Sequence, residues 1–354
     1  MPALYVTTQG AKLRYRTRRL VVELEEREIA SIPAVHVEQV LLFGNISLTT
    51  PALSFLLESG IDTIFLTSQG RYKGRLVGPT GGNGKLRLLQ YQRVSDPAWA
   101  LATALAIVRA KLHNTRTLLR RYVRRRAEPD ALELGDDPPV AAQAESAQCA
   151  LAAAADELDG LIEQAGRCRT VNSLNGVEGR GAAVYFGVFR HMITAPGWSF
   201  EKRTRRPPRD PVNALLSFGY TVLAHNVESA VRAAGLDPYL GFLHQPEYNR
   251  PSLALDLEEE FRPIVVDSVV LRCLNNAIIR PSDFLETPGD TYPVLLLDEG
   301  RERFVRELEA RLNQVFKHPD SDERVNYRRC FNLQARRIAH CVQTGGAYQP
   351  FRVR

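Results

Sequence analysis

The sequence contains no long apolar run and no secretory leader. A helix that spans a bilayer needs about 20 consecutive apolar residues, and no stretch of that kind is present. The first residues, MPALYVTTQGAKLRYR, lack the apolar segment and the cleavage site of a signal peptide. We therefore expect a cytoplasmic protein without a membrane segment.

Cysteine is scarce and scattered. The chain of 354 residues contains five cysteines, and no two of them form a CxxC pair. An odd number of widely spaced cysteines does not form a disulfide framework of the kind that supports small secreted domains. We expect reduced thiols at all five positions, which are Cys149, Cys168, Cys273, Cys330 and Cys341.

Lysine is also rare, whereas arginine is abundant. The formal net charge is +6 and the isoelectric point is about 9.1. A basic excess of this size is by itself weak evidence for nucleic-acid binding. The arginines are clustered, however, and a guanidinium group binds two phosphate oxygens at once. The clusters therefore indicate contacts with nucleic-acid phosphates.

Two stretches carry most of the clustered cations. Residues 120–126 end a long amphipathic helix and include Arg124 and Arg125; the alternative is that they only stabilise the helix C-terminus. Residues 198–210, WSFEKRTRRPPRD, form a basic loop interrupted by proline, with Trp198 and Phe200 beside the cations. This loop suits DNA contact, and a solvated loop is the alternative. Its candidate DNA-binding residues are Lys202, Arg203, Arg205, Arg206 and Arg209.

The length and a change of pattern near residue 80 predict two domains. Short β segments separated by turns fill residues 1–80, with one embedded helix over residues 52–58. From residue 97 the apolar spacing is helical, with a short hairpin expected near residues 292–297. The predicted fold class is α+β. It has a mostly-β domain (1–80), a linker (81–96) and an all-helical C-terminal domain (97–354).

The predicted linker begins near GPTGGNGK, which resembles a phosphate-binding loop. The spacing is one residue longer than GxxxxGK, and Leu86 stands where that loop requires Ser or Thr. We therefore interpret the segment as a flexible connection between domains.

Residues 241–263, GFLHQPEYNRPSLALDLEEEFRP, are the first candidate site. Asp256 and Glu259 are three residues apart, so helical geometry places their carboxylates on one face, and His244 precedes them. An imidazole and carboxylates are ligands that Mg²⁺ and Mn²⁺ accept. The alternative is a solvated acidic face and a histidine in a turn. Apolar residues at helical spacing predict a buried stripe over Leu253, Leu257 and Phe261.

Two further carboxylates are weaker candidates. Glu178 lies between Gly176 and Gly179, and glycines permit a close approach of another chain; an ordinary carboxylate of a first helical turn is the alternative. His225 and Glu228 are three residues apart on a predicted helix, where they are more simply explained as residues of a helix face than as metal ligands.

Several segments carry a family resemblance. They are VEQVLLFGNISLTTPALSFLLESGIDTIFLTSQGRYKGRLVG in the first domain, and NSLNGVEGRGAAVYF, RPPRDPVNALLSFGYTVL, GLDPYLGFLH and RPSLALDLEEEFRP in the second. In this combination and order they resemble the CRISPR-associated integrase family of spacer acquisition, "Cas one". The resemblance covers nearly the whole chain.

The resemblance implies a metal site for Mg²⁺ or Mn²⁺. Its ligands are Glu178 in the E-G motif, His244 in G-F-x-H, and Glu259 in D-L-x-E-x-F-R-P. Asp256 matches a second acidic position beside the metal, where it is expected to accept a proton or hold a metal-bound water. Glu258 departs from the apolar residue usual at its position. Residues expected near the site are Asn213, Ser217 and Tyr220.

The resemblance also implies partners and a reaction. The family joins a β domain to a helical domain, forms homodimers through the β domain, and binds a small ferredoxin-like protein, "Cas two". The implied reaction is attack of a DNA 3′-hydroxyl on a phosphodiester of repeat DNA. Two alternatives stay open: a metal nuclease without strand transfer, and a DNA-binding scaffold without catalysis.

Overall fold

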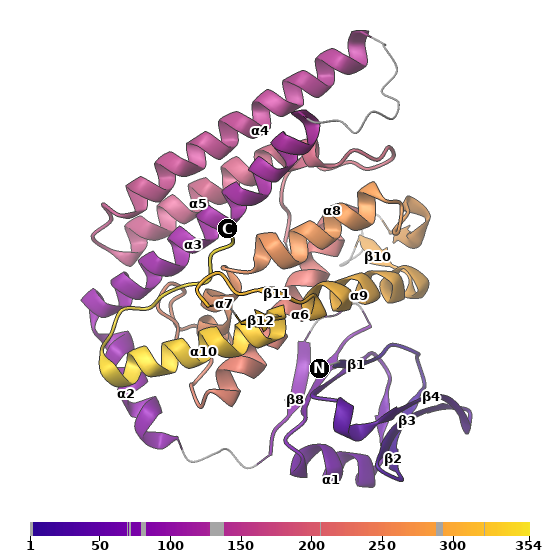
Figure 1. The fold of residues 1–354 in the computed structure, drawn as a ribbon. Coiled ribbons are helices and arrows are strands. Elements are labelled where there is room, and N and C mark those ends of the chain that lie inside the picture. Colours follow the sequence, from indigo (N-terminus) through magenta and orange to yellow (C-terminus); the bar gives the residue numbers. More distant parts are fainter. Residues whose placement is uncertain are drawn as a thin grey trace.

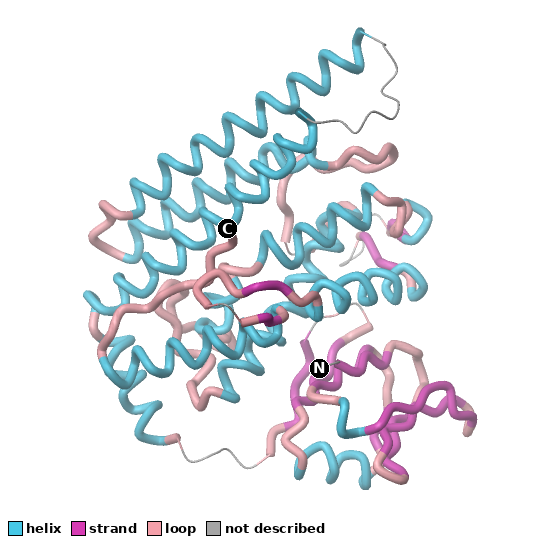
Figure 2. Tube along the Cα trace, viewed as in Figure 1, coloured by secondary structure: helices cyan, strands magenta, loops and turns pink. Residues whose placement is uncertain are grey.

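The computed structural model divides into a strand-rich N-terminal part and a helical C-terminal part (Figures 1 and 2). The α+β class predicted from the sequence is confirmed. None of the described helices is long and apolar enough to cross a membrane. All five cysteines are free thiols. The structure describes residues 3–68, 70, 72–78, 83–127, 138–205, 207–287, 293–321 and 323–354.

In the described residues up to position 78, the strand-rich part contains two four-stranded sheets and one α-helix. One sheet has the order β1-β5-β7-β8, with β1, β5 and β7 parallel and β8 antiparallel to β7. The other sheet has the order β4-β3-β2-β6. The helix is α1 (Thr50–Glu58). The strands are β1 (Ala3–Val6), β2 (Lys12–Arg16), β3 (Arg19–Leu24), β4 (Arg27–Pro33), β5 (Gln39–Phe43), β6 (Ser47–Leu48), β7 (Asp62–Leu66) and β8 (Tyr72–Leu76).

The helical part begins earlier than predicted. Residues 84–95, which we expected within the linker, form helix α2, so the connection between the two parts is shorter than 81–96. The phosphate-loop-like residues 79–82 lie outside the described residues. The α-helices are α2 (Gly84–Ser95), α3 (Pro97–Ala127), α4 (Pro138–Ala165), α5 (Val171–Val188), α6 (Pro211–Ala233), α7 (Ser252–Glu258), α8 (Ser268–Asn275), α9 (Asp298–Asn313) and α10 (Tyr327–Thr344).

The helical part is not entirely helical, which corrects the prediction. Two small antiparallel pairs of strands lie within it, and the first pair includes the hairpin expected near residues 292–297. Their strands are β9 (Phe284–Glu286), β10 (Val294–Leu296), β11 (Phe316–Lys317) and β12 (Arg324–Val325). A π-helix, η3 (Pro263–Asp267), precedes α8.

Helices α3, α4 and α5 run side by side, and each of them contacts the other two (Figure 1). Helix α3 begins where a side-chain oxygen of Asp96 accepts hydrogen bonds from the backbone amides of Ala98 and Trp99, at 3.0 and 3.3 Å. Helix α5 begins at Thr170, whose hydroxyl accepts the amide hydrogen of Ser173. These hydrogen bonds fix where α3 and α5 begin.

Helix α6 lies at the centre of the molecule and contacts α7, α10, β10 and η3. Asp210 caps it by accepting a hydrogen bond from the amide of Asn213, at 2.8 Å. Phe218 on this helix packs between Phe43 of β5 and Phe304 of α9, with ring centroids 5.7 and 6.0 Å away. The central helix therefore joins the strand-rich part to the helical core.

Ion pairs complete this junction. Arg75 of β8 contacts Asp62 of β7 at 3.5 Å and Glu228 of α6 at 3.2 Å. Burial alone would raise the pKa of Glu228, but His225 Nδ1 at 3.5 Å and the charges of Arg75 and Arg232 lower it to about 2. The His225–Glu228 pair is therefore part of the junction, in agreement with the simpler explanation of that pair.

The C-terminal tail is anchored on a buried glutamate. Glu260 accepts hydrogen bonds from the Tyr348 hydroxyl at 2.6 Å, the Phe351 amide at 2.7 Å and the Gln334 amide group at 3.2 Å. Asn114 of α3 donates to the backbone carbonyls of Glu260 and Phe351. The tail thereby closes over α3 and the segment that follows α7.

The tail anchor predicts a pH dependence of stability. Burial raises the pKa of Glu260 from 4.5 to about 7, although its hydrogen bonds lower it. The folded state holds this proton more tightly than the unfolded state does, so the resulting stability is present below pH 4.5 and lost as the pH rises through 7. Between these limits the free energy of unfolding of wild type should fall by on the order of 3 kcal/mol more than that of Glu260→Gln.

Urea unfolding at a series of pH values measures this difference. Glu302→Gln is the matched control, because Glu302 is an exposed carboxylate on α9, and it should keep the wild-type pH profile. Equal pH slopes in wild type and Glu260→Gln would contradict the assignment.

Candidate active site

The segment at and after α7 buries four carboxylates within five residues. Asp256, Glu258, Glu259 and Glu260 are all at most 2% exposed. An isolated buried carboxylate is costly, so each of them requires cations or hydrogen-bond donors. The prediction of a buried stripe over Leu253, Leu257 and Phe261 is confirmed. The alternative of a solvated acidic face is wrong.

Asp256 holds the loop that carries His244. One of its oxygens accepts hydrogen bonds from the amides of Phe242 and Leu243 at 2.5 and 3.0 Å. The other oxygen accepts from the His244 amide at 2.9 Å and lies 2.7 Å from His244 Nδ1. Gly241 permits this tight loop, since a Cβ there would lie 2.8 Å from the His244 carbonyl oxygen.

This geometry corrects the role expected for Asp256. The carboxylate is completely buried and both oxygens are engaged, so it is not free to accept a proton from substrate or to hold a water. Its contact with Nδ1 instead fixes the histidine ring with Nε2 directed away from Asp256. This arrangement is typical of histidines that bind metals.

Glu259 and Glu178 converge on the ammonium group of Lys111. Lys111 Nζ of α3 lies 2.6 Å from Glu259 Oε2 and also contacts Glu178 Oε1 of α5. Glu259 Oε1 accepts a hydrogen bond from Arg262 Nη1 at 2.5 Å. Burial would raise the pKa of Glu259, but Arg262, Lys111 and His244 outweigh burial and hold it well below its usual value. Two carboxylates from different helices thus meet at one cation.

Glu258 is directed to a different partner. It accepts a hydrogen bond from Arg262 Nε at 3.0 Å, and burial raises its pKa although Arg262 lowers it. Lys111 contacts Glu259 and Glu178. The register that assigns the site carboxylate to Glu259 and not to Glu258 therefore fits this arrangement.

The three residues expected near the site surround Arg262 and Arg203. The ring of Tyr220 lies between the two guanidinium groups, whose Cζ atoms are 4.9 and 5.4 Å from its centroid. Arg203 also donates to Asn213 Oδ1 at 2.7 Å and to Ser217 Oγ at 3.0 Å. Residues of α6 therefore connect the basic loop to the buried acids.

The hydroxyl group of Tyr220 is held by the buried carboxylate of Asp267. Asp267 in the π-helix accepts hydrogen bonds from the hydroxyls of Tyr220 at 2.5 Å and Tyr185 at 2.9 Å. Burial raises the pKa of Asp267 to about 6, although both hydroxyls lower it. This network fixes the ring on which Arg262 stacks.

The donor set suits a divalent cation, but its present arrangement does not enclose one. Within the described ranges, no three His, Cys, Asp or Glu side chains are close enough to hold a metal together. Glu178 and Glu259 nevertheless both contact the Lys111 ammonium group, and Nε2 of His244 is directed away from Asp256. Glu178, Glu259 and His244 are the residues that would hold Mg²⁺ or Mn²⁺, provided that the Lys111 ammonium leaves.

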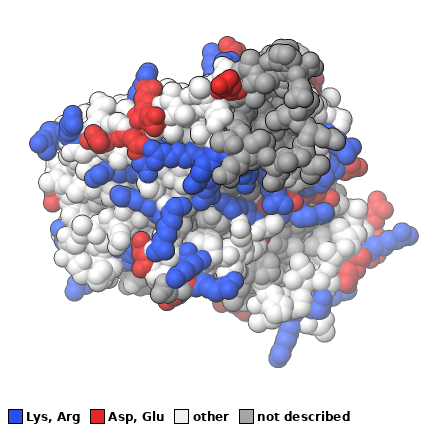
Figure 3. Space-filling view, turned by 45° about the horizontal axis from the view of Figure 1, so that its top comes forward, with Lys and Arg blue, Asp and Glu red and all other residues white. Residues whose placement is uncertain are grey.

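The basic loop is only partly available for DNA. Lys202, Arg205 and Arg209 are exposed, as are Arg124 and Arg125 at the end of α3. Figure 3 shows Lys and Arg side chains gathered in a band across one face. Such exposed cations are suitable for contact with a phosphate backbone.

Other members of that loop face inward, which corrects the prediction. Arg203 is bound by α6, and its pKa is lowered by burial. Phe200 is buried beside Phe189 at 5.0 Å, so it is not free to stack on a base. Trp198 packs edge-on against Phe284 at 6.0 Å. Arg206 lies outside the described residues.

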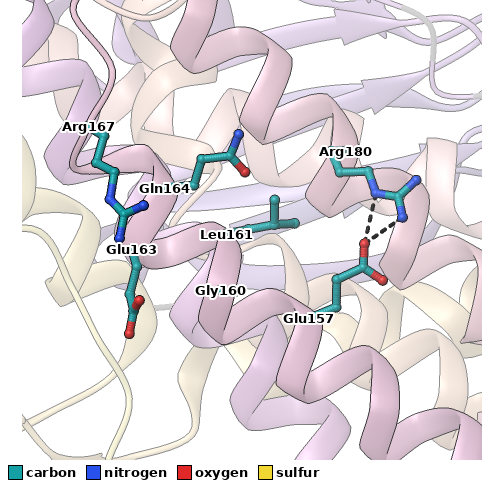
Figure 4. Close-up of a pocket in the computed structure, with 7 residues that line it drawn as sticks. All are labelled: Glu157, Gly160, Leu161, Glu163, Gln164, Arg167 and Arg180. Atoms are coloured by element: carbon teal, nitrogen blue, oxygen red, sulfur yellow. Dashed lines mark hydrogen bonds and ion pairs between the residues drawn. The ribbon is translucent and has the colours of Figure 1, made fainter.

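A surface pocket between α4 and α5 lies away from these acids. Arg180 of α5 donates to Glu157 of α4 at 2.8 and 2.6 Å across this pocket (Figure 4). Two residues along a helix correspond to about 200° of rotation, so Glu178 faces the other side of α5, toward Lys111. The pocket is therefore separate from the candidate site.

Comparison with known proteins identifies the family. The family model described as CRISPR associated protein Cas1 matches residues 4–310. This chain belongs to the Cas1 family. A Geobacter sulfurreducens protein named CRISPR-associated exonuclease Cas4/endonuclease Cas1 fusion is 38% identical over 338 residues, or 94% of this chain. The chain spans 57% of the length of that relative.

Solved Cas1 structures share the fold. A CAS1 protein from Thermotoga maritima has a TM-score of 0.78, with 25% identity and 100% coverage of both chains. A chain of a Cas6-RT-Cas1–Cas2 complex has a TM-score of 0.79 and 26% identity, covering all of this chain and 36% of that one. The resemblance noted in the sequence is thus confirmed at the level of family and fold.

Sequence reasoning missed Lys111 in this Cas1 chain. The residue stands inside the long amphipathic helix α3, where the local pattern of apolar and charged residues explains it completely. Its partners lie 67 and 148 positions further along the chain, at Glu178 and Glu259. A single sequence contains no local signal for such a contact.

The role of Asp256 as the anchor of the histidine loop is testable with Asp256→Asn. An Asn side chain has one acceptor oxygen and an NH₂ group, so at least one buried amide of residues 242–244 loses its partner. We expect a loss of about 1–3 kcal/mol in the free energy of unfolding. Hydrogen exchange at those amides should become faster.

Urea unfolding and site-resolved hydrogen exchange measure both effects. Glu247→Gln is the control, because this exposed carboxylate of the same loop contacts Arg250 at 3.0 Å, and it should change neither quantity. Wild-type protection in Asp256→Asn would show that the carboxylate does not hold the loop.

Proposed function

We propose that this chain is a metal-dependent DNA integrase of CRISPR adaptation with an associated endonuclease activity. One observation carries the proposal: Glu178 and Glu259, from separate helical segments, converge on one cation beside His244. Mg²⁺ or Mn²⁺, when bound there, would supply Lewis-acid stabilisation of the charge that develops on a phosphoryl oxygen. The substrates are spacer DNA and the CRISPR repeat.

The residues of the chain have separate tasks in this reaction. Glu178, His244 and Glu259 bind the cation, and Asp256 keeps His244 Nε2 available by holding Nδ1. Arg262 fixes Glu259 through its 2.5 Å contact, and the ring of Tyr220 supports Arg262. The positions of these groups are set by packing before any DNA arrives, as efficient phosphoryl-transfer sites require.

The exposed cations bind the DNA backbone in this proposal. Lys202, Arg205 and Arg209 of the loop and Arg124 and Arg125 of α3 contact phosphates, which positions the DNA without selecting its sequence. The 3′-hydroxyl of the spacer attacks a repeat phosphodiester, a new phosphodiester forms, and the old 3′-oxygen leaves as a hydroxyl. If water replaces the 3′-hydroxyl, the same arrangement cleaves DNA.

Substitution of either carboxylate tests the proposal. The substrate is a branched DNA that mimics a half-integrated spacer, incubated with Mn²⁺ or Mg²⁺ and, separately, with EDTA. Wild type should reseal the target strand only with metal, and Glu178→Gln and Glu259→Gln should lower the rate by on the order of 10²–10³-fold. Denaturing gels separate resealed strands from shortened ones.

The other products decide between the alternatives. Shortened strands without resealing would favour a nuclease that lacks strand transfer, and tight binding without reaction would favour a scaffold. Full activity in both variants would place the chemistry elsewhere. Glu302→Gln, on the exposed face of α9, is the control and should keep the wild-type rate.

The partners proposed for the chain are DNA, a second copy of itself and the small ferredoxin-like protein Cas2. The Cas6-RT-Cas1–Cas2 complex contains a chain of the same fold together with Cas2, which supports that partner. In the strand-rich part, β4 lies at the edge of its sheet. Ile29 on this strand is 48% exposed, and Val35, which follows the strand, is 80% exposed. Exposed apolar side chains beside an open sheet edge favour a dimer through this part.

Light scattering on the purified protein tests the dimer. We expect a mass of twice 39.6 kDa for wild type and a monomer for Val35→Glu, because a buried charge would destabilise the interface. Leu88→Glu, an equally drastic change at a 61% exposed residue of α2, should stay dimeric. A monomeric wild type, or dissociation by both substitutions, would refute dimerisation through the β part.

A further inference from the structure

Lys111 occupies the point at which two candidate metal ligands meet. Its Nζ is 2.6 Å from Glu259 Oε2 and also contacts Glu178 Oε1. The lysine side chain is only 11% exposed. Its position is therefore set by packing and ion pairing inside the protein, and not by a chance contact of a mobile surface chain.

The two carboxylates depend on this ammonium group to different degrees. Glu259 has a second cation, Arg262, at 2.5 Å. Among the described residues, Lys111 is the cation that contacts Glu178. Without Lys111, two carboxylates would face each other with one guanidinium on the far side of Glu259, and their mutual repulsion would separate α5 from the segment after α7.

Most cationic side chains of this protein are arginines, so the presence of a lysine at position 111 points to a property that arginine lacks. A guanidinium group is a wide, rigid fork that binds carboxylates in a fixed plane. An ammonium group is compact, bonds in any direction and sits on a flexible four-carbon stem. The ammonium group of lysine is therefore closer in shape to a metal ion than a guanidinium group is. Its flexible stem also lets it move away from the carboxylates more easily.

The ammonium and a metal cannot share this point. Mg²⁺ binds carboxylate oxygens at about 2.0–2.1 Å, within the space that Nζ now fills. The carboxylates of Glu178 and Glu259 are paired with Lys111 and Arg262, and Arg262 also contacts Glu258. A divalent cation would replace the charge of Lys111 and exceed it, so the ammonium would then be repelled.

We propose that Lys111 is an internal substitute for the metal, which holds Glu178 and Glu259 in place until a divalent cation displaces it. This inference rests on the proposed function. Glu178 and His244 are each 22% exposed in their side chains, so the point lies beside the surface. Lys111 is a positioning residue that competes with the metal for Glu178 and Glu259.

Labelling of the wild-type protein tests the displacement directly. Isotopic reductive methylation followed by mass spectrometry measures the reactivity of each amine, and the small number of lysines keeps the spectra simple. Addition of Mn²⁺ should raise the labelling of Lys111 several-fold, while the exposed Lys202 stays constant. Lys111 labelling that does not change when Mn²⁺ binds would overturn the inference.

Substitution gives an independent measurement. Lys111→Met removes the charge and keeps the length of the side chain, so the metal-free protein should melt at a lower temperature while its Mn²⁺ dissociation constant falls by about ten-fold. Calorimetric titration and thermal melting give the two quantities. Lys111→Arg keeps the charge and should bind Mn²⁺ no more tightly than wild type, and Lys12→Met, at an exposed lysine of β2, should behave as wild type in both assays.

The outcomes separate this inference from the proposed function. If wild type binds Mn²⁺ and Glu178→Gln and Glu259→Gln do not, the metal site stands. In that case, unchanged or weaker Mn²⁺ binding by Lys111→Met would refute only the role of Lys111. If none of these folded proteins binds Mn²⁺, both the inference and the metal-dependent function fail.

Discussion

The ion-pair chain from Glu178 through Lys111 and Glu259 to Arg262 is the constraint on which the rest of the site depends. It connects α5, α3 and the segment after α7, and it pairs Glu259, which is almost completely removed from water, with Lys111 and Arg262. Burial of charge is unfavourable unless each group is paired, so these helices have few other ways to pack together. The same requirement that fixes the packing also brings candidate ligands to one point.

The hydrogen bonds around these ion pairs contribute more to the positions of the site residues than to the stability of the fold. The two oxygens of Asp256 bind three consecutive backbone amides and one imidazole nitrogen. These contacts fix the ring of His244 and leave neither oxygen free to react with a substrate. On the other side, Tyr220 supports Arg262 and is itself held by Asp267 in a π-helix. Irregular helical turns of this kind are frequent at functional sites.

Much of the architecture could be predicted from the sequence, because it depends on local patterns. The spacing of apolar residues located the long helices, and the stripe that ends at Phe261 predicted the buried face of α7. Helix α2 was missed because its glycine-rich start resembles a linker. Motif resemblance selected Glu178, His244 and Glu259, whereas spacing alone could not distinguish Glu259 from Glu258.

The rest of the site depends on contacts between distant segments. Lys111 has no local signature, and the inward direction of Arg203 follows from acceptors on α6 that a basic, proline-rich loop does not reveal. The metal and the strand-transfer reaction stay predictions, since the structure shows the donor set and not the bound ion.

The anchoring of the tail on Glu260 has a consequence for the order of events during synthesis. Glu260 adjoins Glu259, and its donors come from Tyr348 and Phe351, about ninety positions later in the chain. A ribosome that has translated α3, α5 and α7 has therefore made the candidate ligands Glu178 and Glu259, but not the groups that donate hydrogen bonds to Glu260. The packing around the candidate site is therefore complete only after residues 348–351 have been made and have folded back onto Glu260.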